Sequence, residues 1–258
     1  MSEQARPAIP DVIIGGAPRS GTTFLCELLA KHPGVFVAQP FSPEPKVLLM
    51  PYPDGDAGVW HRYENFFADA PWGSVRVEKT SHLFENDAGR ERLARLLPDV
   101  RLIFILREPV ARAYSNWRRS RSNGLETLSF ADAIAAEGRR PNPFDPDREY
   151  VRPFDYMIRS QYARFAERWI ASIGRERIAF FMFEEAIAQP DRFVLRLQDF
   201  LRVEQLPWAA LATGIINAND GCTLGVDAQL RAKLREAIGG EMRRLGDLTG
   251  LDVSRWGY

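Results

Sequence analysis

The sequence predicts an α/β fold in which helices flank a central parallel sheet of about five strands, forming three layers. Short β-rich apolar runs alternate with helical patterns over most of the 258 residues. Two of these runs are apolar throughout, as expected for strands that are buried on both faces. With 45% hydrophobic residues the chain can build a large core. We therefore expect residues 1–258 to form a single domain.

Five segments are predicted to be strands. They cover residues 12–15, 35–38, 75–78, 101–106 and 178–183. The last two contain the uninterrupted apolar runs 102–106 and 178–181, so we expect them at the centre of the sheet.

Helices are predicted between the strands, where apolar residues recur at helical spacing. They cover residue 22 to about 31, about 87 to 97, 109 to the stop at 123–124, 156–173 and a long segment after 227. Pro109 suits the first position of the third helix. The polar side of this helix carries Arg112, Ser115 and Arg119.

Charge and cysteine content limit the classes of function. Lysine plus arginine equals aspartate plus glutamate at 34 each, so no global field favours binding to nucleic acid or to an anionic membrane. The two cysteines are Cys26, inside a predicted helix, and Cys222, which argues against a disulfide framework. No apolar run approaches the ~18 residues of a membrane span. We expect a soluble, cytoplasmic protein whose anion site is local.

The segment that joins the first predicted strand to the first helix has the composition of an anion-binding loop. It reads Gly16-Ala17-Pro18-Arg19-Ser20-Gly21-Thr22-Thr23. Backbone N–H groups and a helix N-terminus converge on one point in such a loop. The glycine spacing matches the start of a Walker A motif, but Thr22 stands where that motif needs lysine. The cation is Arg19 instead, and Thr22 and Thr23 add hydroxyl donors.

A second anion site is predicted after the strand at 101–106. A phosphotransferase of the P-loop class would place a magnesium-binding aspartate at this sheet edge, whereas this chain has Arg107. A cation there favours an additional phosphate over a metal ion, and Ser115 can donate to the same anion. The three histidines and two cysteines show no metal-ligand spacing, so no metal site is expected.

The two anion segments resemble motifs of the sulfotransferases that depend on 3′-phosphoadenosine 5′-phosphosulfate (PAPS), in the pattern of the bacterial, heparan-sulfate-type and tyrosylprotein-type branches. Residues 17–23 are similar to the 5′-phosphosulfate loop, and residues 106–115 to the 3′-phosphate motif, with its arginine and serine at Arg107 and Ser115. The donor-binding residues that the resemblance implies in the loop are Pro18, Arg19, Ser20, Gly21, Thr22 and Thr23.

The resemblance implies a P-loop-like fold and a reaction. The sulfuryl group of PAPS would move to a hydroxyl or amine of a small-molecule or carbohydrate acceptor, releasing adenosine 3′,5′-bisphosphate (PAP), without a metal. Glu44 falls at the place of the general base, and Lys79 at that of a lysine on the bridging oxygen of the donor, with Arg19 sharing its role. His61 and His82 remain rival candidates for the base.

One segment departs from the family pattern. In the heparan-sulfate branch a C-terminal loop with basic residues closes over the nucleotide, whereas the counterpart at 220–225 has none. We expect Gly221, Cys222 and Thr223 to contact the donor through backbone groups and the threonine hydroxyl.

Two long segments, 39–73 and 138–153, are rich in proline and are predicted to be loops that form a lid or bind the acceptor. The first contains aromatic residues that suit either a wall for a sugar or aryl ring or a satellite core. These aromatic residues are Trp60, Tyr63, Phe66, Phe67 and Trp72. A P-loop phosphotransferase and a non-catalytic nucleotide-binding module remain as alternative functions. The sequence leaves the acceptor and the oligomeric state open.

Overall fold

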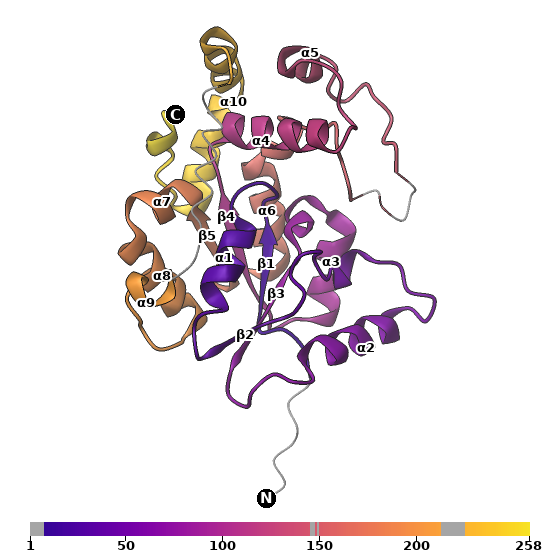
Figure 1. Ribbon diagram of the computed structural model, residues 1–258, viewed down its shortest axis with the longest axis vertical. Helices are drawn as coiled ribbons and strands as arrows, with labels where there is room; N and C mark the ends of the chain where they lie inside the picture. Colours follow the sequence, from indigo (N-terminus) through magenta and orange to yellow (C-terminus); the bar gives the residue numbers. More distant parts are fainter. Residues whose placement is uncertain (1–7, 145–147, 149, 213–224) are drawn as a thin grey trace, which may run out of the picture.

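A five-stranded parallel sheet lies at the centre of the molecule (Figure 1). The computed structural model describes residues 8–144, 148, 150–212 and 225–258. The strands are β1 (Val12–Gly16), β2 (Val35–Val37), β3 (Val75–Lys79), β4 (Arg101–Leu106) and β5 (Ile178–Met182). Each agrees with its predicted range to within one residue at either end. The predicted α/β class with a parallel sheet is confirmed. The expectation that 178–183 is a central strand is wrong, because β5 lies at the edge of the sheet. Its apolar run reflects burial of the strand and not a central place.

The strand order β2-β3-β1-β4-β5 reverses direction between β1 and β4, which is the place where open parallel sheets have their ligand crevice. From β1 the chain moves outward to β2 and back to β3, and then crosses to β4 on the other side of β1. Open parallel sheets bind ligands at such a reversal, beyond the carboxyl ends of the strands. Both predicted anion segments begin at this crevice, since they follow β1 and β4.

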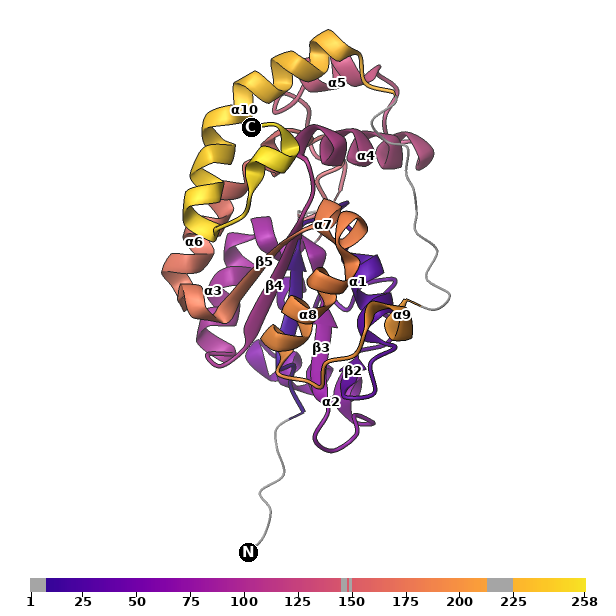
Figure 2. The same cartoon turned by 90° about the vertical axis from the view of Figure 1, so that its left-hand side faces the viewer.

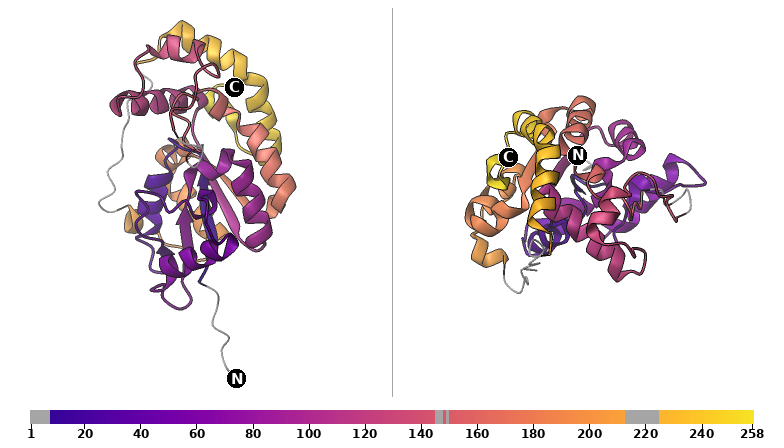
Figure 3. Two further views of the ribbon diagram at one scale, coloured as in Figure 1. Left: turned by 90° about the vertical axis from the view of Figure 1, so that its right-hand side faces the viewer. Right: turned by 90° about the horizontal axis from the view of Figure 1, so that it is seen from above.

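Helices cover both faces of the sheet, because successive strand residues point to opposite sides. Val12 and Ile14 face α1 (Thr22–Leu29) and α8 (Pro190–Leu201). Ile13 faces the layer that contains α3 (Asp87–Leu96), α6 (Tyr162–Ile173) and α10 (Ala228–Thr249). Figures 2 and 3 show these layers, with α10 running alongside α6.

The remaining elements surround the carboxyl edge and the rim of the sheet. The helices are α2 (Asp56–Phe67), α4 (Pro109–Ser122), α5 (Phe130–Ala135), α7 (Phe183–Ala188) and α9 (Trp208–Leu211). The 3₁₀ turns are η1 (Val47–Leu49), η2 (Ser81–Glu85), η4 (Ile158–Ser160), η5 (Arg175–Arg177) and η6 (Val253–Trp256). No helix in the described ranges combines the length and the apolar character that crossing a bilayer requires.

The prediction that 39–73 is irregular throughout is wrong, because α2 lies inside it. Val59, Tyr63 and Phe67 repeat at a spacing of four residues and are buried against the core, which stabilises a helix there. Tyr63 and Phe67 therefore belong to the core, with Trp60 and Phe66 packed against it. Trp72 is 72% exposed and lies outside this cluster.

The predicted helix at 156–173 begins later than expected, at Tyr162. Residues Ile158–Ser160 form the 3₁₀ turn η4, and Gln161 has ψ 64°, which is not helical. The side chains of Arg159 and Ser160 are buried and bind Glu85 and Arg112. These tertiary bonds hold the segment in a turn, although its apolar spacing suits a helix.

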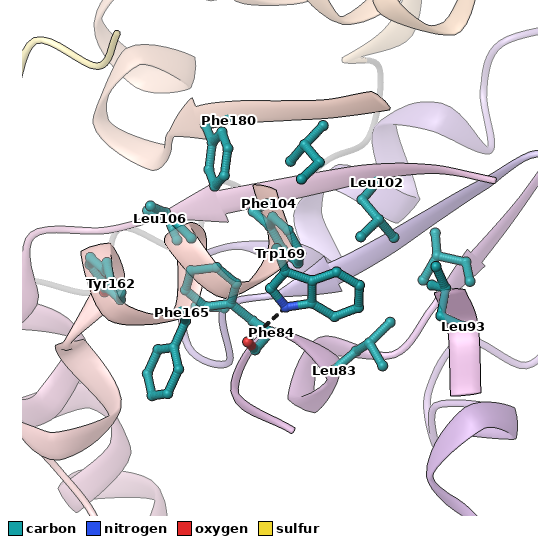
Figure 4. Close-up of a cluster of buried hydrophobic side chains, with 14 of the residues drawn as sticks. Leu83, Phe84, Leu93, Leu102, Phe104, Leu106, Tyr162, Phe165, Trp169 and Phe180 are labelled. Carbon is teal, nitrogen blue, oxygen red and sulfur yellow. Dashed lines mark hydrogen bonds between the residues drawn. The ribbon is translucent and has the colours of Figure 1, made fainter. Parts of the chain in front are cut away.

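Trp169 is central to the core on the α6 side of the sheet (Figure 4). Its ring centroid lies 5.5 Å from that of Phe104 on β4, and its indole N–H donates to the Phe84 carbonyl at 2.9 Å. Phe84 in turn lies 4.5 Å from Phe104, ring centroid to ring centroid. This cluster joins α6, β4 and η2, and so supports the segment that carries the site residues after β3.

We predict that Trp169→Ala lowers the free energy of unfolding by about 3–5 kcal/mol, because it leaves a cavity and an unpaired carbonyl. Chemical denaturation measures the change. Trp72→Ala is the matched control, and its stability should stay within about 0.5 kcal/mol of the parent chain. Equal losses in the two variants would contradict the packing described for Trp169.

Candidate functional site

The loop after β1 is held in the conformation that an anion cradle requires. Gly21 has φ 94°, and a Cβ atom there would lie 2.4 Å from the Phe183 ring, so only glycine fits. Arg19 also adopts a left-handed conformation, with φ 67°. The Ala17 N–H donates to the Ile105 carbonyl at 2.8 Å and ties the loop to β4. Ser20 is fully buried, and its hydroxyl forms no hydrogen bond with any described residue.

Arg107 and Ser115 form the second part of the cradle. The Arg107 side chain lies over the Phe183 ring, 5.4 Å from its centroid, and the residue is 9% exposed. Within the described part of the chain its guanidinium has no hydrogen bond or ion pair. The Arg19 Nε donates to the buried Ser115 Oγ at 3.1 Å. The two predicted anion segments, 96 residues apart in sequence, therefore meet in the structure.

Glu44 and Lys79 lie together beside the loop. The Lys79 Nζ is 3.6 Å from Glu44 Oε1 and donates to Thr23 Oγ1 at 3.0 Å. Lys79 is 3% exposed and Glu44 12%, so this pair is largely shielded from water. The backbone N–H of Ser81 donates to Glu44 at 3.1 Å and its hydroxyl at 2.6 Å. The Glu44 carboxylate is thus fixed beside Lys79, near the place where the anion loop joins helix α1.

Of the two rival histidines, the structure places only His82 near Glu44. The His82 Nδ1 is 3.7 Å from Glu44 Oε2. His61 lies on α2, is 76% exposed, and pairs with Glu64. His82 therefore stays a candidate for a catalytic role and His61 does not.

The Glu44 environment favours the ionised carboxylate. Burial by itself would raise the pKa of Glu44, but the nearby His82, the charge of Lys79 and the hydrogen bond from Ser81 lower it to about 2. Its ordinary value is 4.5. Glu44 is therefore an anion at neutral pH, held by cationic and hydroxyl donors.

A second carboxyl group, that of Glu78, lies near enough to Glu44 to interact with it electrostatically. Glu78 was not singled out from the sequence. It is fully buried on β3 and accepts hydrogen bonds from the hydroxyls of Thr80 and Tyr63. Burial raises the pKa of Glu78 to about 7, although both hydroxyls lower it in part. The available signal was an acidic residue at the end of a predicted strand, directly after the apolar Val77.

The polar side of α4 is only partly exposed to solvent. Arg119 is exposed, but Ser115 and Arg112 are buried. Arg112 Nε donates to Ser160 Oγ at 2.8 Å, and its Nη2 donates to the Tyr156 carbonyl. Nearby, Arg159 Nε and Glu85 Oε2 form a buried pair at 2.9 Å. These polar contacts, which sequence reasoning missed, fix α4 and hence Ser115 at the crevice.

Two pockets open near Glu44, and Arg107 lines neither of them. One of about 430 Å³ is lined by Glu44, Lys46, Tyr52, Arg62 and Tyr150, among others. Another of about 620 Å³ lies beyond Tyr150 and includes His82, Arg140 and Phe154. Tyr150 separates the two, with its ring edge toward His82 and Lys46 over its face. Both long segments of the sequence, 39–73 and 138–153, thus contribute walls to these pockets.

The predicted donor contacts at Gly221, Cys222 and Thr223 lie outside the described residues. The described chain resumes at Gly225, against Tyr114 of α4, where an added Cβ would collide with the tyrosine hydroxyl.

The family model for the "Sulfotransferase domain" matches residues 9–207. The chain belongs to the sulfotransferase family. This match covers both anion segments, Glu44 and Lys79, and it confirms the resemblance found in the sequence. The roles of individual residues remain predictions.

Curated relatives of this chain include proteins named as heparan sulfate sulfotransferases. Heparan sulfate glucosamine 3-O-sulfotransferase 3A1 of Mus musculus is 25% identical over 206 residues, covering 80% of this chain and 49% of the relative. The bifunctional heparan sulfate N-deacetylase/N-sulfotransferase of Drosophila melanogaster is 27% identical over 220 residues, covering 77% of this chain and 20% of the relative. The chain thus spans about half the length of the 3-O-sulfotransferase.

A solved sulfotransferase from Alicyclobacillus acidocaldarius has the same fold. It superposes with a TM-score of 0.78 at 24% identity, covering 99% of this chain and all of its own. The P-loop-like three-layer architecture predicted from the sequence is therefore confirmed over nearly the whole chain.

We predict that Glu44→Gln destabilises the protein more at neutral pH than in acid. The folded-state pKa of Glu44 lies below its ordinary value of 4.5, so the stability gained by ionisation is complete above 4.5 and is lost as the pH falls toward 2. The stability difference between parent and variant should shrink by about 1 kcal/mol from pH 7 to pH 4.

Denaturant titrations at the two pH values measure this difference. Glu91→Gln, at an exposed position of α3, is the control and should differ from the parent by less than about 0.5 kcal/mol at both. If the difference in stability between the parent and Glu44→Gln does not change with pH, the low pKa of Glu44 is contradicted.

Proposed function

We propose that this chain transfers the sulfuryl group of PAPS to a hydroxyl or amine of a carbohydrate or small-molecule acceptor and releases PAP. The observation that carries the proposal is the Arg19–Ser115 contact, which joins both anion segments into one cradle next to Lys79 and Glu44. A donor with anionic groups at two ends, as PAPS has, matches a cradle of this kind. The family match supports the same chemistry.

The donor would occupy the crevice between β1 and β4. The backbone N–H groups of the loop, with Arg19, Thr22 and Thr23, would bind the 5′-phosphosulfate. Arg107 and Ser115 would bind the 3′-phosphate. We propose that no metal is needed, because the cations Arg19, Lys79 and Arg107 stand where charge must be neutralised.

Glu44 is proposed as the general base. It would take the proton of the acceptor hydroxyl or amine as the acceptor atom attacks sulfur, while the bond between sulfur and the bridging oxygen breaks. The electron pair of that bond goes to the departing phosphate of PAP. Lys79, held by Thr23, and Arg19 would stabilise this growing negative charge. His82, near the other carboxylate oxygen of Glu44, would help to hold the carboxylate in place.

The acceptor would bind in the pockets beside Glu44. Tyr52 and Tyr150 offer aromatic surfaces suited to a sugar or aryl ring, and Lys46 and Arg62 supply donors. The names of the curated relatives, which refer to heparan sulfate, support a carbohydrate among the acceptors.

The alternatives are less well supported. A P-loop phosphotransferase needs a lysine where this chain has Thr22, and a magnesium-binding acidic residue where it has Arg107. A non-catalytic binding module would not require the buried Glu44–Lys79 pair next to the cradle.

We predict that PAP stabilises the protein against heat in the absence of magnesium. At a concentration of about 100 Kd the ligand should add about 2.7 kcal/mol, seen as an upward shift in Tm. ATP with magnesium should give a smaller shift. Stabilisation by ATP with magnesium but not by PAP would overturn the proposal.

The variant Arg107→Gln tests, by the same thermal stabilisation, whether Arg107 binds the 3′-phosphate. Because hydrogen bonds to charged groups contribute about 1.5–3 kcal/mol, PAP binding should weaken by about 10- to 100-fold. Binding of adenosine 5′-phosphate, which lacks the 3′-phosphate, should change far less. An equal loss for both nucleotides would show that Arg107 does not contact the 3′-phosphate.

We predict that Glu44→Gln lowers kcat for sulfuryl transfer by ~10²–10⁴-fold, because the variant cannot accept the acceptor proton. The measurement is transfer of radiolabelled sulfate from PAPS to a panel of amino sugars and phenols. The affinity for PAP should be retained, which separates a catalytic loss from misfolding.

His61→Gln is the matched control, since His61 is an exposed candidate base on α2 that does not reach Glu44. It should transfer sulfate at the parent rate. Unchanged turnover in Glu44→Gln would rule out this base, and no transfer by the parent to any acceptor would favour the binding-module alternative.

A further inference from the structure

The C-terminal segment packs against the region that carries Arg107. It comprises η6 (Val253–Trp256) and the residues up to Tyr258, and it follows the long helix α10. In Figure 2 this segment lies between α10 and the start of α4. Its side chains contact two glutamates, Glu108 and Glu184, which adjoin Arg107 and Phe183 in sequence. None of these contacts was expected from the sequence.

Both carboxylate oxygens of Glu184 are engaged. The backbone N–H of Glu108 donates to Oε1 at 2.9 Å, and the indole N–H of Trp256 donates to Oε2 at 2.7 Å. The Trp256 ring is almost fully buried and packs against Tyr162, with 6.3 Å between ring centroids. Glu184 is therefore held from two sides.

Both oxygens of Glu108 are also engaged. Oε2 accepts the Ala111 N–H at 2.7 Å, which caps the start of α4. Oε1 accepts the Tyr258 hydroxyl at 3.2 Å and lies 3.5 Å from Arg235 Nε. Arg235 in turn lies over the Tyr258 ring, 5.2 Å from its centroid.

Arg107 lies among these groups without pairing with them. The Tyr162 hydroxyl donates to its backbone carbonyl at 2.9 Å, and its guanidinium lies over Phe183. Glu184 is close enough to interact electrostatically with Arg107, but no ion pair joins it to Arg107 in the described structure. A carboxylate that closed on Arg107 would neutralise the cation and compete with a phosphate for its donors.

We propose that Trp256 and Tyr258 are positioning residues for nucleotide binding, which hold Glu184 and Glu108 away from Arg107 so that its guanidinium stays available to a 3′-phosphate. This inference rests on the proposed function, because it assigns the 3′-phosphate of the donor to Arg107. It adds a role for the C-terminal segment.

The mechanism is a competition for one cation. Removing the Trp256 donor leaves Glu184 Oε2 without its hydrogen bond in a largely buried place, and an unpaired carboxylate oxygen there is costly. Pairing with Arg107 would recover that cost. The nucleotide would then have to displace Glu184 before its 3′-phosphate could bind.

The test measures the affinities for PAP and for adenosine 5′-phosphate by calorimetry, because the two differ in the 3′-phosphate. In Trp256→Phe we expect the Kd for PAP to rise by about three- to tenfold, in the lower part of the range for residues in contact. The Kd for adenosine 5′-phosphate should stay within about twofold, since a competition at Arg107 does not affect it. Tyr258→Phe should show the same selectivity with a smaller effect, because Glu108 keeps Ala111 and Arg235 as partners.

A rescue experiment separates competition from a general structural loss. Adding Glu184→Gln to Trp256→Phe removes the competing charge, so PAP affinity should return to the parent value. If Trp256→Phe does not fold, Tyr258→Phe with and without Glu108→Gln gives the same comparison. Arg255→Gln is the control, because Arg255 belongs to the same segment but pairs only with Asp252 among the described residues.

The inference would be overturned if affinity fell equally for the two nucleotides, or if Trp256→Phe and Tyr258→Phe both left PAP affinity unchanged. It would also be overturned if the glutamine substitutions did not restore the lost PAP affinity. Failure of the proposed function would look different, since the parent chain itself would then not bind PAP.

Discussion

The pairing of β1 with β4 is the interaction on which the site depends. These strands run parallel, with Ile14 opposite Ile103, and their carboxyl ends therefore open side by side. The hydrogen bond from Ala17 to Ile105 extends this pairing into the anion loop. Arg19 then reaches Ser115 on α4, the helix that follows β4. A shift of β4 relative to β1 would separate the two halves of the cradle, because each half is anchored to its own strand.

The site contains buried carboxylates, which are electrostatically unfavourable unless donors surround them. Each of them is held by specific donors. Glu44 is bound by Ser81 and lies against Lys79 and His82, which keeps it ionised. Glu78 has only hydroxyl donors among the described residues, and its pKa is raised by burial. The chain has no net charge, so the anion site exists because cations and carboxylates are sorted locally. Loss of one donor would change which partner a carboxylate takes.

Much of the fold could be predicted because strand and helix signals agree with burial along this chain. The strand at 101–106 is apolar throughout and is buried as expected, and Pro109 begins the helix that follows it. Helices α5, α7, α8 and α9 were not predicted, and two further segments show where local pattern falls short. The helix α2 depends on burying Tyr63 and Phe67 against a core built from distant strands, and the start of α6 is displaced because Arg159 and Ser160 bind partners far away in sequence.

The sequence by itself determined the parallel sheet, the loop with Arg19 between two glycines, and the arginine at the end of β4, because these depend on residues that are neighbours in the chain. It also marked Glu44 and Lys79 through the family resemblance. Only the tertiary structure decided that Arg19 meets Ser115, that His82 and not His61 adjoins Glu44, and that Trp256 and Tyr258 bind the glutamates beside Arg107. The physical reason is that these contacts join residues from different elements, and their distances are set by how strands and helices pack and not by their spacing in the sequence.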